Sequence, residues 1–124
     1  MIKFLADKRR PSGDRVFVVC PIIAGSAVSD VVDLALFTLV GIQVGAAFTG
    51  THLLFDASWN GTTIVPFYDD AGNRITTLAA ATRYIDLEID DFDSVRFIRL
   101  ISATGVAQTA QVAEATLTLV LRRV

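Results

Sequence analysis

The side chains best suited to chemistry gather in the segment SWNGTTIVPFYDDAGNRI, residues 58–75. Two aromatic rings there could stack against the apolar face of a sugar, while neighbouring carboxylates and an amide could hydrogen-bond its hydroxyl groups. The candidate glycan contacts are therefore Trp59, Tyr68, Asp69, Asp70 and Asn73.

Turn formation offers a simpler explanation of the same segment. Asn60-Gly61 is a strong hairpin signal, because both residues tolerate a positive φ. The run DDAGN provides a second turn, with Gly72 or Asn73 in a left-handed position. We therefore expect Trp59 and Tyr68 to close one end of the fold, and glycan binding remains the alternative.

An acidic run, DLEIDDFD, follows at residues 86–93. Its alternating carboxylates resemble part of a calcium-binding loop, but no glycine follows and no glutamate completes an EF-hand. An exposed strand face produces the same alternation, so we expect such a face here. If calcium binds in this segment, its ligands are Asp90, Asp91 and Asp93.

Few residues could support catalysis. His52 is the only histidine, and GTHL around it is not a nucleophile elbow. Cys20, the only cysteine, lies in the apolar run VFVVCPII and is expected to be a buried, inert thiol. One cysteine forms no internal disulfide, and with one histidine it cannot supply the usual ligands of a structural zinc site. We expect no enzyme activity, no cofactor and no metal.

Composition narrows the class of protein further. The 124 residues suit one domain, and 52% of them are hydrophobic against 19% charged. This excess predicts sheets covered on both faces, or further surface buried against neighbouring subunits. A net charge of −2 argues against direct binding to nucleic acid. The most apolar span is broken by Asp33, Gln43 and two glycines, so no membrane span and no signal peptide are expected.

Short apolar runs rich in β-branched and aromatic residues recur between turn residues, which predicts an all-β fold. In HLLFDASW, for example, Leu53 and Phe55 alternate with His52 and Asp56. About eight strands at this spacing predict an antiparallel two-sheet β-sandwich that resembles a jelly roll. The expected strands are 16–23, 37–44, 52–58, 63–67, 74–78, 83–87, 95–101 and 115–122, with a short pairing segment near Val31.

The beginning of the chain differs from the rest. Five of the eleven basic residues lie within the first fifteen positions, which also contain Pro11 and Gly13. This composition predicts an extended basic N-terminal arm, residues 1–15, ahead of a β-sandwich domain, residues 16–124. The arm is either solvated or lies on a neighbouring subunit and pairs with its acidic face.

Several segments resemble a group of small β-sandwich proteins of tailed bacteriophages and prophages. They are DLALFTLVGIQV, FTGTHLLFDASWNGTTIVPFYDDAGNRIT, ATRYIDLEIDDFDSVRFIRLISAT and ATLTLVLRR. The resemblance covers about residues 29–122 and excludes the basic arm. The group usually has Asp-Gly where this chain has Asn60-Gly61, and a Pro-Ala near Gly45-Ala46 is missing here. The turn chemistry is retained, so the resemblance implies a structural protein of the virion.

Among virion proteins, a sandwich of this kind suits a capsid decoration (cement) protein, which binds between capsomers on the assembled head. The implied partners are the major capsid protein or other virion proteins, and a homo-oligomer, with a trimer favoured. The residues expected at these contacts are Lys8, Arg9, Arg10, Arg15, Arg96, Arg99, Arg122 and Arg123. The alternatives are a glycan- or receptor-binding module of a fibre or spike, and a ring component of the neck or tail.

Overall fold

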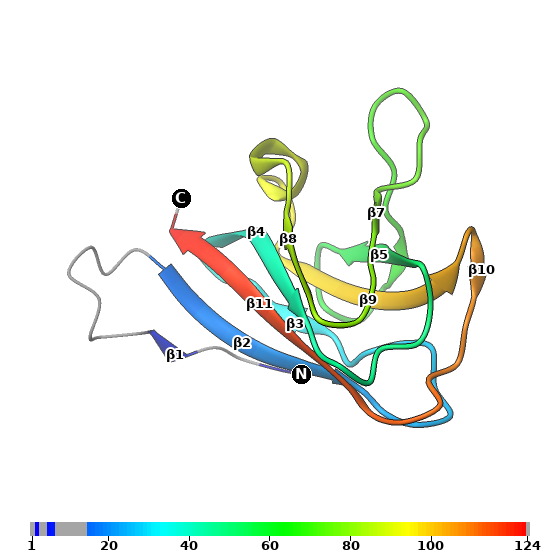
Figure 1. Cartoon of the computed structure of the whole chain (residues 1–124). Helices are drawn as coiled ribbons and strands as arrows, with labels where there is room; N and C mark the ends of the chain where they lie inside the picture. The colour runs from blue at the N-terminus through cyan, green and yellow to red at the C-terminus, as the bar shows by residue number, and fades with distance from the viewer. Residues whose placement is uncertain (1, 3–4, 7–14, 124) are drawn as a thin grey trace.

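The computed structural model describes residues 2, 5–6 and 15–123, and these form an all-β, antiparallel two-sheet sandwich (Figure 1). Within this part of the chain no helix has the length and apolar character that a membrane span needs. The elements in chain order are β1 (Leu5–Ala6), β2 (Arg15–Ile22), β3 (Val32–Asp33), β4 (Phe37–Val44), β5 (His52–Ser58), β6 (Val65–Pro66), β7 (Thr76–Leu78), β8 (Arg83–Asp86), the 3-10 helix η1 (Ile89–Phe92), β9 (Phe97–Thr104), β10 (Ala107–Gln108) and β11 (Ala115–Arg123).

The two sheets mix strands from distant parts of the sequence. The first sheet has the order β1-β2-β11-β4-β8, so β11 lies between two strands formed much earlier in the chain (Figure 1). The second sheet has the order β10-β9-β5-β6, with β3 paired to β9 and β7 paired to β5. All these strand pairs are antiparallel, as the alternating sequence pattern predicts.

The core lies between the sheets and follows from the period of two in each strand. In β2 every second residue is buried, and in β11 the three leucines of LTLVL point inward. The helix η1 contributes Phe92, whose ring meets Phe55 edge-on with centroids 5.0 Å apart and Phe67 at 5.7 Å. Edge-to-face pairs of this geometry are favourable beyond the area they bury, so Phe92 anchors η1 on the sandwich.

The strand predictions are largely confirmed. β4 and β5 have the expected bounds, while β6 and β7 are shorter than expected and β9 starts at Phe97 rather than Val95. The two-residue strands β1 and β10 were not predicted. β1 lies within the predicted arm, where Leu5 pairs with Phe17, and Ile2 forms a bridge to Val32.

The prediction that β5 has one solvent-facing side is wrong. Leu54, Asp56 and Ser58, which alternate with the core residues Leu53 and Phe55, are buried as well, and Asp56 is only 4% exposed. Its carboxylate accepts hydrogen bonds from Arg74 Nη2 at 2.8 Å and from Arg99 Nη2 at 2.6 Å. A buried carboxylate needs such partners, because desolvation disfavours its charge. Asp56 therefore ties β5 to β9 and to the turn that carries Arg74.

We predict that Asp56→Ala lowers the free energy of unfolding by about 3–5 kcal/mol, because it leaves two guanidinium groups without their shared anion. Urea denaturation followed by circular dichroism measures this loss. The exposed Asp86 is the matched control, and Asp86→Ala should change the stability by less than about 0.5 kcal/mol. Equal effects of the two substitutions would contradict the role given to Asp56.

Candidate functional site

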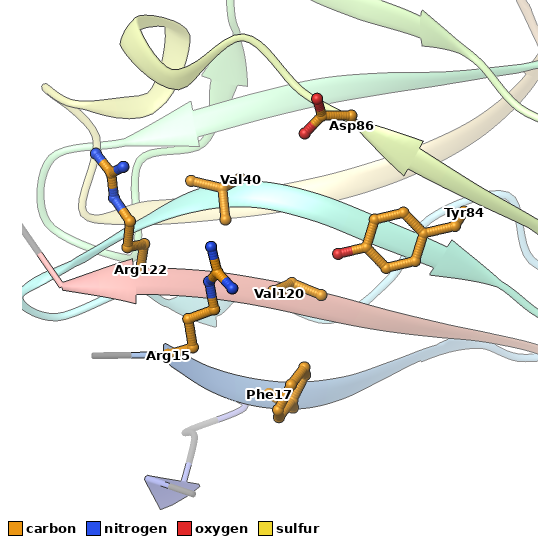
Figure 2. Close-up of a pocket in the computed structure, with 7 residues that line it drawn as sticks. All are labelled: Arg15, Phe17, Val40, Tyr84, Asp86, Val120 and Arg122. Carbon is orange, nitrogen blue, oxygen red and sulfur yellow. The ribbon is translucent and has the colours of Figure 1, made fainter. Parts of the chain in front are cut away.

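The outer surface of the first sheet carries a hollow of about 280 Å³, lined by Arg15, Phe17, Val40, Tyr84, Asp86, Val120 and Arg122 (Figure 2). We call this surface the arginine face. Its residues come from four neighbouring strands, β2, β11, β4 and β8, and their side chains alternate with the buried ones beneath. The register of β11 places Val120 beside Phe17 of β2 and beside Gly41 of β4.

Gly41 leaves room for Tyr84 to extend over β4. A Cβ at this position would lie 2.9 Å from the Tyr84 hydroxyl oxygen and 3.3 Å from the Ile85 carbonyl oxygen, so a larger residue would displace the tyrosine ring. Figure 2 shows Tyr84 and Phe17 on opposite sides of Val120. An irregular register between Val120 and Leu121 adds Val40 to the lining.

Large apolar side chains stay accessible on this face. Phe17 is 39% exposed, Tyr84 59%, and Val19, next to the hollow on β2, 56%. Single exposed apolar residues are common on protein surfaces, but a contiguous group on one sheet is typical of a contact surface. The arrangement therefore suits binding to another protein.

Two cations border this apolar group. Arg15 and Arg122 are direct cross-strand partners, and like charges placed opposite each other destabilise a sheet. Among the described residues neither guanidinium forms an ion pair. Figure 2 shows Arg15 reaching over the hollow from the end of β2. A carboxylate from a partner would relieve the repulsion between the two arginines.

The other predicted contact residues are distributed differently. Lys8, Arg9 and Arg10 lie outside the described residues. Arg123 follows Arg122 at the end of β11 and is exposed. Arg96 and Arg99 lie in or next to β9, in the second sheet, and their guanidinium groups are bound within the chain.

The Arg96 pair illustrates this internal use of arginine. Its Nε donates to Asp33 Oδ1 at 3.1 Å, and its guanidinium carbon lies 5.0 Å from the centroid of the Phe97 ring. The hydrogen bond to Asp33 and the charge of that carboxylate raise the pKa of Arg96 above its usual range. Arg96 therefore already pairs within the chain, with Asp33, which lies 63 residues earlier in the sequence.

The candidate glycan residues do not form one group. Trp59 is 83% exposed and lines a shallow hollow with Val65 and Val95, whereas Tyr68 lines a different hollow with Arg74. Asp69 is engaged in its own turn, where its Oδ1 accepts from the backbone N–H groups of Ala71 and Asn73. Trp59 and Tyr68 therefore cannot act as one stacking platform.

Both predicted turns are present, although their chemistry differs. In the first turn, the Asn60 side-chain oxygen Oδ1 accepts hydrogen bonds from the backbone N–H groups of Thr62 and Thr63 and so stabilises the turn. Gly61 takes the positive φ, at 81°. In the second turn Gly72 takes the left-handed position with φ 86°.

The acidic run folds partly into η1 rather than continuing as a strand. Burial, followed by the charges of Glu88, Asp69 and Asp90, raises the pKa of Asp91. Within residues 15–123 and the short described part before them, no group of three or more His, Cys, Asp or Glu residues is arranged to hold a metal ion.

Sequence reasoning identified Arg15 and Arg122 but missed Phe17, Val19, Val40 and Tyr84, which give the arginine face its apolar character. The run RVFVV contained a signal, because its apolar residues occupy both alternating sets of positions in a strand. Such a strand is covered on both faces, either by its own chain or by a partner.

Comparison with known proteins gives a structural context only. No protein-family model and no curated protein matches the sequence. The SPBc2 prophage-derived protein YomS is similar at 11% identity and a TM-score of 0.48, over 86% of this chain and 93% of YomS. The cysteine peptidase peruvianin-I from Thevetia peruviana latex is similar at 9% identity and 0.46, over 99% of this chain and 61% of the peptidase. A cupin protein from Bacteroides fragilis is similar at 12% and 0.39, over 89% and 66%.

Identities and scores this low assign neither a family nor a function. The class that the structure itself defines is an antiparallel β-sandwich with an accessible apolar and cationic surface on one sheet.

Cys20 gives a test of the packing beneath the arginine face. The thiol is fully buried, and burial raises its pKa from 9.0 to about 11. We predict negligible reaction with a disulfide reagent at pH 8 in the folded protein, and complete reaction in urea. Between pH 9 and about 11 the unfolded chain loses this proton first, so the free energy of unfolding falls as the pH rises. Rapid labelling of the folded protein would contradict the packing described.

Proposed function

We propose that this chain is a structural protein of a bacteriophage virion, most simply a capsid decoration protein that docks through the arginine face. Its partner is an acidic and apolar patch of the major capsid protein. The observation that carries the proposal is the coexistence of exposed Phe17, Val19 and Tyr84 with two cross-strand arginines that lack a carboxylate partner among the described residues.

The composition of the arginine face supports docking to a protein. Aromatic residues and arginine are enriched at the centre of protein interfaces, where they contribute most of the binding energy. Burying Phe17 and Tyr84 removes apolar surface from water, and a partner carboxylate between Arg15 and Arg122 replaces repulsion with two charge-assisted hydrogen bonds.

The start of the sequence contains Lys8, Arg9 and Arg10, and this positive charge complements the acidic patch proposed on the partner.

The resemblance to small β-sandwich virion proteins supports a place in the virion. Multivalent binding explains how such a protein would stabilise the head. On a head, many copies bind at equivalent sites, so modest individual contacts that bridge adjacent capsomers sum to a large stabilisation of the shell. A homo-oligomer, with a trimer favoured, would bring several arginine faces to one joint.

Arg122→Glu tests the docking surface, because it should affect stability and binding in opposite directions. A glutamate opposite Arg15 replaces a repulsive pair with an attractive one, so the free energy of unfolding should rise by about 0.5 kcal/mol. Binding to purified heads that lack this protein, measured by co-sedimentation, should fall about tenfold or more.

The matched control is Trp59→Ala, which removes an exposed aromatic residue outside the arginine face. It should leave head binding unchanged. Unchanged binding of the Arg122→Glu variant would show that the arginine face is not the docking surface.

The copy number in purified particles tests the assignment to the head. Decoration predicts on the order of hundreds of copies, in near-constant ratio to the major capsid protein, because every equivalent site is filled. Quantitative mass spectrometry against that protein measures the ratio. A dozen copies or fewer would contradict decoration and favour the neck or tail ring, or the fibre module.

A further inference from the structure

A second hollow, of about 410 Å³, lies on the outer surface of the second sheet, away from the arginine face. It is lined by His52, Leu54, Tyr68, Arg74, Thr76, Gly105 and Val106. β5 and β7 form its floor, where Leu54 pairs with Thr76, and the turns around Tyr68 and Gly105 form its walls. Its volume is within the range of small-ligand sites.

Arg74 is held rigidly at the edge of this hollow. Its Nε and Nη2 donate to the Phe55 carbonyl oxygen at 3.3 and 3.2 Å, and Nη2 also donates to Asp56 Oδ1 at 2.8 Å. These bonds use one side of the guanidinium group, and within the described chain Nη1 has no hydrogen-bond partner. Arg74 can therefore donate a hydrogen bond from Nη1 to a ligand, and little further side-chain conformational entropy is lost when it does so.

The charge balance around Arg74 favours an anion. Asp56 is shared between Arg74 and Arg99, so two guanidinium groups face one carboxylate. Asp69, in the turn before Arg74, uses its Oδ1 to accept hydrogen bonds from the backbone N–H groups of Ala71 and Asn73, and no ion pair to Arg74 is formed by it among the described residues. An incoming carboxylate would complete the charge balance.

The remaining lining suits a ring that has one apolar face and several hydroxyl groups. The Tyr68 ring is 53% exposed and has the Arg74 guanidinium 5.8 Å from its centroid. Thr76 donates to the Leu53 carbonyl, which leaves its hydroxyl oxygen as an acceptor. The Thr51 hydroxyl contacts His52 Nδ1 at 2.8 Å and accepts from the Gly105 N–H, so the floor and one wall are joined.

We propose that this hollow binds an acidic sugar of the uronic acid type. Arg74 receives the carboxylate, Tyr68 stacks on the apolar face of the ring, and His52 and Thr76 hydrogen-bond ring hydroxyl groups. Of the residues predicted from the sequence to contact glycan, this site contains only Tyr68. The proposal is independent of docking, because the arginine face shares none of these residues.

Titration of the full chain with sodium D-glucuronate, followed by NMR chemical shifts, tests the proposal. D-glucose is the control for the ring without the charge, and sodium acetate is the control for the charge without the ring. We expect saturable binding of glucuronate, about tenfold tighter than binding of either control. Comparable affinity for glucose or acetate, or no saturable binding of glucuronate, would overturn the proposal.

Two variants locate the binding in this hollow. Tyr68→Ala and Arg74→Lys should each weaken glucuronate binding about tenfold, because stacking or the planar donor group is lost. Tyr84→Ala is the matched control, since Tyr84 is similarly exposed on the other sheet, and it should leave glucuronate binding unchanged.

Circular dichroism checks that the variants fold. Arg74 also supports Asp56, so if Arg74→Lys unfolds, Tyr68→Ala decides the question: undiminished binding by that variant refutes the site. The same Tyr68→Ala variant should bind purified heads as the unchanged protein does, although its glucuronate binding is weakened. Failure of either proposal is therefore visible separately from failure of the other.

Discussion

The shared carboxylate of Asp56 is the interaction on which the second sheet depends. It is almost completely buried, and Arg74 and Arg99 both bind it. Through these two bonds a single side chain fixes β5 against β9 and positions the turn after β6. The same turn forms a wall of the larger hollow, so the shape of that hollow follows from the burial of one acid.

The two outer surfaces of the sandwich use arginine in opposite ways. On the second sheet, Arg74, Arg96 and Arg99 are each bound to an aspartate of the same chain. On the first sheet, Arg15 and Arg122 face each other beside exposed apolar residues, without such a partner among the described residues. Paired arginines add to the stability of the fold, whereas the facing pair opposes it slightly. This difference is why the arginine face, and not Arg96 or Arg99, carries the docking proposal.

Much of the fold could be predicted from the sequence, because period-two alternation and turn residues act locally. β4 and β5 were predicted with their bounds, whereas η1 lies where the acidic run had been expected to form an exposed strand face. The burial of Asp56 could not be predicted, because its partner Arg99 lies 43 residues away and β5 looked like a half-exposed strand. The separation of Trp59 from Tyr68 could not be predicted either, because closeness in sequence does not determine which surface hollow a side chain lines.

The central place of β11 in the first sheet has a consequence for the order of synthesis. β2 and β4 cannot join until Ala115–Arg123 has been made and inserted between them, so the sheet closes through contacts that are distant in sequence. Val120 and Arg122 of the arginine face belong to this strand. A chain broken before β11 therefore has no assembled arginine face, because two of the residues that line it are missing and β2 and β4 have no strand between them.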